Sequence, residues 1–157
     1  MFDSDALPLP LELPLEREAI QQLIPHREPF LWLDRVVVLT PERIVAQKRI
    51  AADLDIFRGH YPHFPVLPGV LQCEAAFQAG AVLIATQFPP SEGQVPVVTR
   101  LNNVQFRKMV APGETIELEV ELTEKLTNAF FLKGKVSVNG KVCVRLEFAC
   151  ALATPEN

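Results

Sequence analysis

Residues 69–87 read GVLQCEAAFQAGAVLIATQ, and this stretch decides the fold. It follows Pro68, and proline is common at the start of a helix. Its apolar residues fall on every side of the predicted helix, so we expect the helix to lie in the middle of the fold, without a solvent face. A membrane span would need about 20 such residues. Three glutamines, one acid and the short length argue against a span.

The one charged residue in this helix is Glu74. Moving an unpaired carboxylate out of water is costly, so a buried acid either finds a partner or keeps its proton. Glu74 is therefore the first candidate for chemistry.

Composition predicts an ordinary soluble protein with one domain, since 48% of its 157 residues are hydrophobic and 22% are charged. The net charge of −4 argues against a nucleic-acid binder. Cys73, Cys143 and Cys150 lack the spacing of metal ligands, so we predict no metal site and reduced, buried thiols in the cytoplasm. No charged segment followed by an apolar core opens the chain, and we expect no secretory signal.

The chain divides into a Pro/Leu-rich arm, residues 1–16, and a single domain, residues 17–157. Closely spaced prolines prevent regular structure in the arm. Its leucines alternate, which predicts that one side lies along a groove of the body or of a second subunit; they are Leu7, Leu9, Leu11, Leu13 and Leu15. A short amphipathic helix over 16–24 follows and ends before Pro25.

Alternating apolar residues predict a series of strands. They cover residues 30–39, 43–50, 97–110 (the longest), 116–122, 129–138 and 142–150. Asn139-Gly140 indicates a tight hairpin. The fold class is therefore α+β, an antiparallel sheet of five to six strands wrapped around the helix at 69–87. One sheet face cannot cover a helix that is apolar all round, so we expect a dimer with sheet pairing across the interface.

Three features converge near the start of this helix. His60 lies in a shaped loop, Glu74 follows fourteen residues later, and Gly69 begins the helix. A neutral imidazole accepts a proton, a buried carboxyl donates one, and a helix N-terminus offers free N–H groups to an oxyanion. Each residue also has a purely structural interpretation. Together they supply what is needed to remove a proton α to a carbonyl and expel a β-hydroxyl as water.

The segment GHYPHFPVLPGVLQCEAAFQ resembles the motif of the (3R)-hydroxyacyl-acyl-carrier-protein dehydratases of FabZ type. Upstream, IPHREPFLWLDRVVVL resembles a second motif of that family, and downstream VQFRKMVAPGE resembles a third. The resemblance covers about residues 18–151. It implies a hotdog fold and a dimer or trimer of dimers, acting without a cofactor in fatty acid biosynthesis.

The resemblance implies a role for each matching residue. His60 would take the C2 proton of a 3-hydroxyacyl thioester, Glu74 of the partner subunit would protonate the leaving hydroxyl, and the Gly69 amide would polarise the thioester carbonyl. Gln78 would orient Glu74. The acyl chain would occupy a tunnel near Phe106 and Phe77; Phe77 is bulkier than the family's usual residue, which leaves chain-length preference open.

Other polar residues receive weaker interpretations. His26, His63 and the adjacent Asp34 and Arg35 are interpreted as structural. Four cations are candidates for contact with an acidic carrier protein; they are Arg58, Arg100, Arg107 and Lys108. A coenzyme A thioester is the alternative substrate form.

Three alternatives stay open at this point. A dehydratase-isomerase typically carries Asp at the helix position, so Glu74 favours the plain dehydratase. A hotdog thioesterase generally lacks the loop that holds His60. A non-catalytic acyl- or carrier-binding protein would not need the pair His60 and Glu74.

Overall fold

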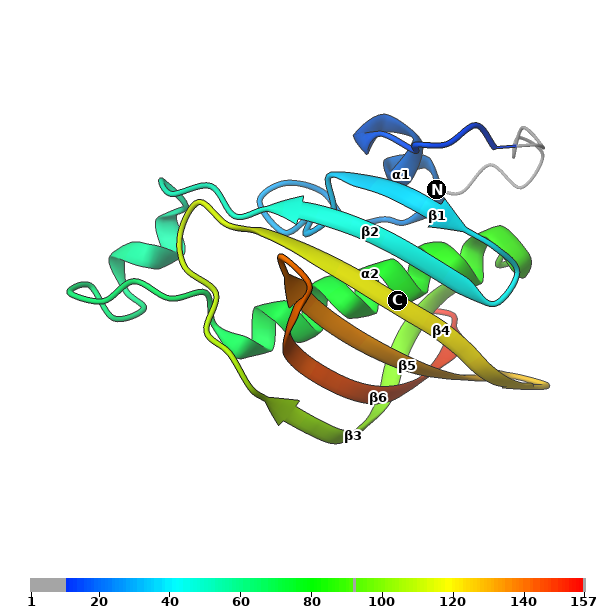
Figure 1. The fold of residues 1–157 in the computed structure, drawn as a ribbon. Coiled ribbons are helices and arrows are strands. Elements are labelled where there is room, and N and C mark those ends of the chain that lie inside the picture. Colours follow the sequence, from blue (N-terminus) through cyan, green and yellow to red (C-terminus); the bar gives the residue numbers. More distant parts are fainter. Residues whose placement is uncertain (1–10, 92, 157) are drawn as a thin grey trace.

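One long helix lies against a curved antiparallel sheet (Figure 1) in this computed structural model, which describes residues 11–91 and 93–156. The helix is α2 (Gly69–Gln87), with the bounds that the sequence predicts. Most of its side chains are buried, which confirms its central place. By length and composition α2 alone among the described helices is long and apolar enough to cross a membrane, but 67% of that window is buried inside the fold.

The expectation that this helix has no solvent face is wrong at its first turn. Val70 is 70% exposed, because no described part of the protomer packs over that side of the turn. Further along, the helix approaches the sheet closely at Gly80. A Cβ atom there would meet the ring of Phe148 at 2.9 Å, so the glycine permits this contact.

The sheet has six strands in the order β1-β2-β4-β5-β6-β3, and every neighbouring pair is antiparallel. The α+β class and the upper strand number are thus confirmed. The bounds are β1 (Arg35–Leu39), β2 (Arg43–Arg49), β3 (Val95–Phe106), β4 (Thr115–Leu126), β5 (Ala129–Val138) and β6 (Lys141–Ala153). Between β5 and β6, Asn139 and Gly140 both have positive φ (49° and 77°), which confirms the tight hairpin.

Two predicted strands are wrong at their ends. The first begins at Arg35 rather than Phe30, because Gln78 of α2 binds the carbonyl of Phe30 and the amide of Trp32. The strand predicted over 97–110 ends at Phe106, because the Val110 carbonyl accepts the amide of Leu67 from the loop before α2. It is also shorter than β6, which is the longest strand at 13 residues.

Shorter elements surround this core. Helix α1 (Arg17–Leu23) lies beside β1 in Figure 1, and a 3₁₀ turn, η1 (Asp55–Arg58), precedes the loop that holds His60. Of the alternating leucines, Leu7 and Leu9 lie outside the described residues. Leu15 is buried and pairs with Val36 through two backbone hydrogen bonds of 2.9 Å, and Leu11 packs against the core. Leu13 is 45% exposed, so the leucines do not share one buried side. The three cysteines are free and buried, as expected.

Candidate active site

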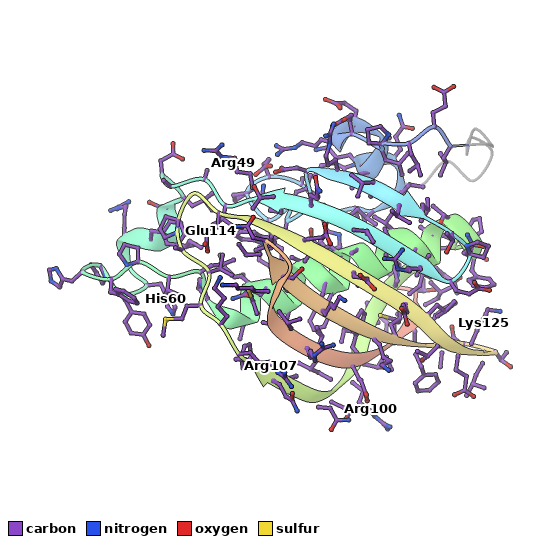
Figure 2. The ribbon with its side chains drawn as sticks, viewed as in Figure 1. Arg49, His60, Arg100, Arg107, Glu114 and Lys125 are labelled. Carbon is purple, nitrogen blue, oxygen red and sulfur yellow. The ribbon has the colours of Figure 1, made fainter. Side chains whose placement is uncertain are left out.

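A cavity of about 460 Å³ lies at the N-terminus of α2 and brings three predicted site residues together: His60, Gly69 and Phe106. Its other walls are mainly apolar; they are Tyr61, Val66, Leu67, Val70 and Met109, with polar Gln72, Arg107 and Lys108. Figure 2 shows His60 toward one end of the molecule and Lys125 toward the other, with Arg107 between them.

His60 is held by its loop so that one ring nitrogen stays available. Its amide donates to the carbonyl of Ile56 (2.9 Å), and Nδ1 lies 2.6 Å from the carbonyl oxygen of Val66. A carbonyl only accepts hydrogen bonds, so Nδ1 carries the hydrogen and Nε2 keeps its lone pair. The ring is also packed against Tyr61, with centroids 4.6 Å apart. This arrangement prepares Nε2 to act as a base.

The first turn of α2 brings free backbone N–H groups to the cavity. Gly69 is the first residue of the helix, where N–H groups lack an intrahelical acceptor. The Phe106 ring packs against this glycine, and a Cβ atom at position 69 would lie 2.5 Å from Cε1 of the ring. Glycine therefore allows an aromatic wall directly beside the free amide.

Glu74 lies in a second group of residues, held by Gln78. The amide of Trp32 donates to Oε1 of Gln78 (2.7 Å), which establishes that this atom is the amide oxygen. Nε2 of Gln78 therefore donates to the carbonyl of Phe30 (2.9 Å) and to Oε1 of Glu74 (3.0 Å). The Gln78 side chain is fully buried, so its orientation is fixed.

His26 also approaches the acid, which the sequence analysis missed. Its Nε2 lies 3.7 Å from Oε1 of Glu74. The only sequence signal was its place in the segment IPHREPFLWLDR. Burial raises the pKa of Glu74, and the hydrogen bond from Gln78 offsets part of that rise. Burial lowers the pKa of His26, and the nearby Arg27 charge lowers it further. The pair therefore favours a protonated carboxyl beside a neutral imidazole.

One protomer does not bring the two groups together, since Glu74, Gln78 and Phe77 do not line the cavity at His60. Five residues along a helix correspond to about 7.5 Å of rise and about 140° of rotation, so Gly69 and Glu74 face different sides. Phe77 packs its ring on Phe148 instead, with centroids 5.0 Å apart.

The strand nearest the cavity forms an open edge of the sheet. β3 pairs with β6 on one side and is the last strand of the sheet on the other. Its exposed residues include Val97, Val98 and Leu101, each more than a third exposed. A long edge strand with apolar side chains is a surface on which another strand can pair.

The remaining candidates are dispersed. Arg107 and Lys108 line the cavity, whereas Arg58 pairs with Asp55 at 2.6 Å and Arg100 lies along β3 (Figure 2). Asp34 does not pair with Arg35: it binds the side chains of Arg17 (2.6 Å) and Lys48 (3.3 Å) and the amide of Arg49 (2.8 Å). Arg35 pairs with Glu16.

Known proteins resemble this chain over most of its length. The family described as FabA-like domain matches residues 24–147. A 3-hydroxyacyl-(acyl-carrier-protein) dehydratase FabZ of Xanthomonas oryzae pv. oryzae is 40% identical over 147 residues, which is 90% of this chain and 95% of that protein. The FabZ of Clostridium tetani is 42% identical over 129 residues, 82% of this chain and 90% of that protein.

Solved structures show a similar fold. The dehydratase heterocomplex ApeI:P from Xenorhabdus doucetiae aligns with a TM-score of 0.70 at 17% identity, covering 94% of each chain. A hypothetical thioesterase with coenzyme A from Streptococcus pneumoniae TIGR4 aligns with a TM-score of 0.60 at 8% identity, covering 78% of this chain and 87% of that one. At these identities the likeness concerns the fold alone.

Proposed function

The chain belongs to the FabA-like family and is a 3-hydroxyacyl-acyl-carrier-protein dehydratase with a hotdog fold; from this premise we propose that His60 and Glu74 of opposite subunits perform the dehydration. The observation that carries this proposal is the tautomer of His60. Its Nδ1–H binds the Val66 carbonyl, so a basic Nε2 is available in a cavity that also contains the first amide of α2.

The proposed reaction needs two proton transfers. Nε2 of His60 removes the C2 proton of a (3R)-hydroxyacyl thioester while the Gly69 amide stabilises the developing charge on the thioester oxygen. The electron pair of the C2–H bond forms the C2=C3 double bond, and the C3–O bond breaks. The carboxyl of Glu74 protonates the departing hydroxyl, which leaves as water. A trans-2-enoyl thioester is the product, and no cofactor is required.

A dimer is proposed because one protomer lacks the complete site. The apolar edge of β3 offers strand pairing, and the exposed Val70, Phe106 and Met109 beside the cavity offer apolar surface to a second copy. The pairing would bring the partner's Glu74 to the cavity that contains His60. A trimer of such dimers is the proposed larger assembly.

The substrate is proposed to arrive on acyl carrier protein in fatty acid biosynthesis, in the cytoplasm. Arg107 and Lys108 at the cavity are suited to an acidic partner. Coenzyme A thioesters are the alternative form. The tunnel for the acyl chain is proposed to start between Phe106 and the partner's helix and to end near Phe77.

The decisive experiment measures hydration and dehydration of enoyl and 3-hydroxyacyl thioesters of graded length with wild type, His60→Ala and Glu74→Gln. We expect turnover by wild type and a loss of about 10²-fold or more in either variant. Full activity of His60→Ala contradicts the proposed mechanism. Release of free acid from the same thioesters identifies a thioesterase instead.

A further inference from the structure

We propose that His26 is a positioning residue for the acid: with Gln78 it holds Oε1 of Glu74 as a hydrogen-bond acceptor, so that the acidic hydrogen resides on Oε2. This inference rests on the proposed role of Glu74. His26 lies on the loop between α1 and β1, 48 residues before Glu74, and no sequence pattern connects the two. Only the fold brings Nε2 of its ring to 3.7 Å from Oε1 of Glu74.

The two oxygens of the Glu74 carboxyl have different surroundings. Gln78 donates to Oε1, and the Trp32 amide fixes the direction of that donation. In a protonated carboxyl the oxygen without hydrogen is the better acceptor. The hydrogen therefore belongs on Oε2, and both described polar neighbours of the carboxyl, Gln78 and His26, lie at the other oxygen.

The buried ring nitrogen of His26 determines its tautomer. Its Nδ1 is buried and has no hydrogen-bond partner among the described residues. A buried N–H without an acceptor is less favourable than a buried lone pair, so Nε2 carries the hydrogen. Nε2–H then faces Oε1 of Glu74. The distance of 3.7 Å is longer than a hydrogen bond, and we expect it to shorten when Glu74 becomes a carboxylate during turnover.

The surroundings of His26 oppose a positive charge on its ring. The described groups that face His26 are Glu74 from α2 and the neighbouring Arg27, whose guanidinium is fixed on the carbonyls of Gln21, Ile24 and His26. Burial and this cation both oppose protonation of the imidazole, in keeping with its lowered pKa. A neutral His26 presents Nε2–H to Oε1 of Glu74 and leaves Glu74 protonated. An imidazolium would instead convert Glu74 to a carboxylate and abolish the acid, so activity must fall when His26 becomes charged.

The test compares His26→Ala with His26→Gln, because the Gln Nε2 can replace the donor Nε2 of histidine but does not titrate. We expect His26→Ala to lower kcat about tenfold to a hundredfold with KM within about twofold, and His26→Gln to restore most of kcat. In wild type, protonation of His26 should add one ionisation to the acid limb of log kcat against pH. In His26→Gln that ionisation is absent, so the limb should be less steep. His63→Ala, which removes an exposed histidine, is the control and should keep the wild-type limb.

The outcomes separate the two hypotheses. An inactive wild type, or a fully active Glu74→Gln, contradicts the proposed function itself. If wild type is active and Glu74→Gln is not, full kcat in His26→Ala overturns the positioning role. Equal loss in the Ala and Gln variants also overturns it, as does an unchanged acid limb in His26→Gln. The pH profiles need only wild type and His26→Gln, so the proposal stays testable even where His26→Ala does not fold.

Discussion

Gly69 and Phe106 lie so close together that a Cβ atom at position 69 would be 2.5 Å from a carbon of the aromatic ring. This relationship joins the start of α2 to the end of β3. It shapes the wall of the cavity beside the proposed oxyanion donor.

Replacing Gly69 by Ala should therefore damage activity more than stability. Alanine suits a helix at least as well as glycine, so unfolding free energy should change by less than about 1 kcal/mol. The half-exposed Phe106 ring has to move, which displaces the cavity wall and should lower kcat/KM about tenfold or more. Thioester kinetics and urea unfolding measure the two effects. The double variant Gly69→Ala/Phe106→Ala removes the clash, so its kcat/KM should fall by less than the product of the two single-variant losses. A loss equal to that product would contradict the explanation.

Gln78→Ala should destabilise the protein strongly, because Gln78 binds two backbone groups of the 30–32 segment and Glu74. Each buried polar group left unpaired costs about 1–3 kcal/mol, so we expect a total loss above about 2 kcal/mol. Gln72→Ala is the matched control. That residue is also a buried glutamine of α2, but its Oε1 has no partner among the described residues. If urea unfolding gives the same loss of unfolding free energy for Gln78→Ala and Gln72→Ala, the hydrogen bonds of Gln78 contribute little.

Phe77→Ala should shift the acyl-chain preference towards longer substrates. The ring packs edge-on against Phe148, and its removal opens space at the proposed end of the tunnel. Because Phe77 is only partly buried, the truncation should cost less than the about 3–5 kcal/mol typical of a fully buried Phe. Phe88→Ala is the control, because that ring packs on Phe130 beyond the end of α2. The measurement is the ratio of kcat/KM for long and short thioesters. An unchanged ratio refutes the placement of Phe77 at the end of the acyl tunnel.

A charge on the β3 edge should separate the subunits. Leu101→Glu places a carboxylate on the strand that we propose pairs across the dimer, so we expect monomers and a loss of activity. Leu126→Glu is the control, since Leu126 is similarly exposed (51% against 44%) but lies at the end of β4. Light scattering after gel filtration gives the molecular mass. A Leu101→Glu dimer with full activity would rule out this edge as the interface.

Asp34→Asn should weaken the fold in a pH-dependent way. Burial alone would raise the pKa of Asp34, but the amide of Arg49 and the side chains of Arg17 and Lys48 together bring it below its ordinary value. The ionised carboxyl thus contributes stability at pH values above about 4, the unfolded pKa, and this contribution disappears as pH falls through the lower folded pKa. We expect a loss of about 1–3 kcal/mol at pH 7.

The comparison variant is Asp55→Asn, whose ion pair with Arg58 is 84% exposed on both sides and should contribute little. The test measures the free energy of unfolding of wild type, Asp34→Asn and Asp55→Asn at pH 7 and near pH 3. A difference between wild type and Asp34→Asn that is the same at both pH values would contradict the role of the ionised carboxylate.

Local patterns in the sequence determined the helix at 69–87, the Asn139-Gly140 hairpin and the alternating strands. Each depends on neighbours within a few residues, so periodicity and turn chemistry are sufficient to find them. His60 and Glu74 became candidates through their residue types and through the resemblance of the surrounding segment to a family motif. Only the tertiary structure decided which nitrogen of His60 is free, where the first strand begins and which histidine lies beside Glu74. Those features depend on contacts between distant segments, such as Gln78 with the 30–32 segment, and hydrogen-bond partners that far apart leave no periodic trace in the chain.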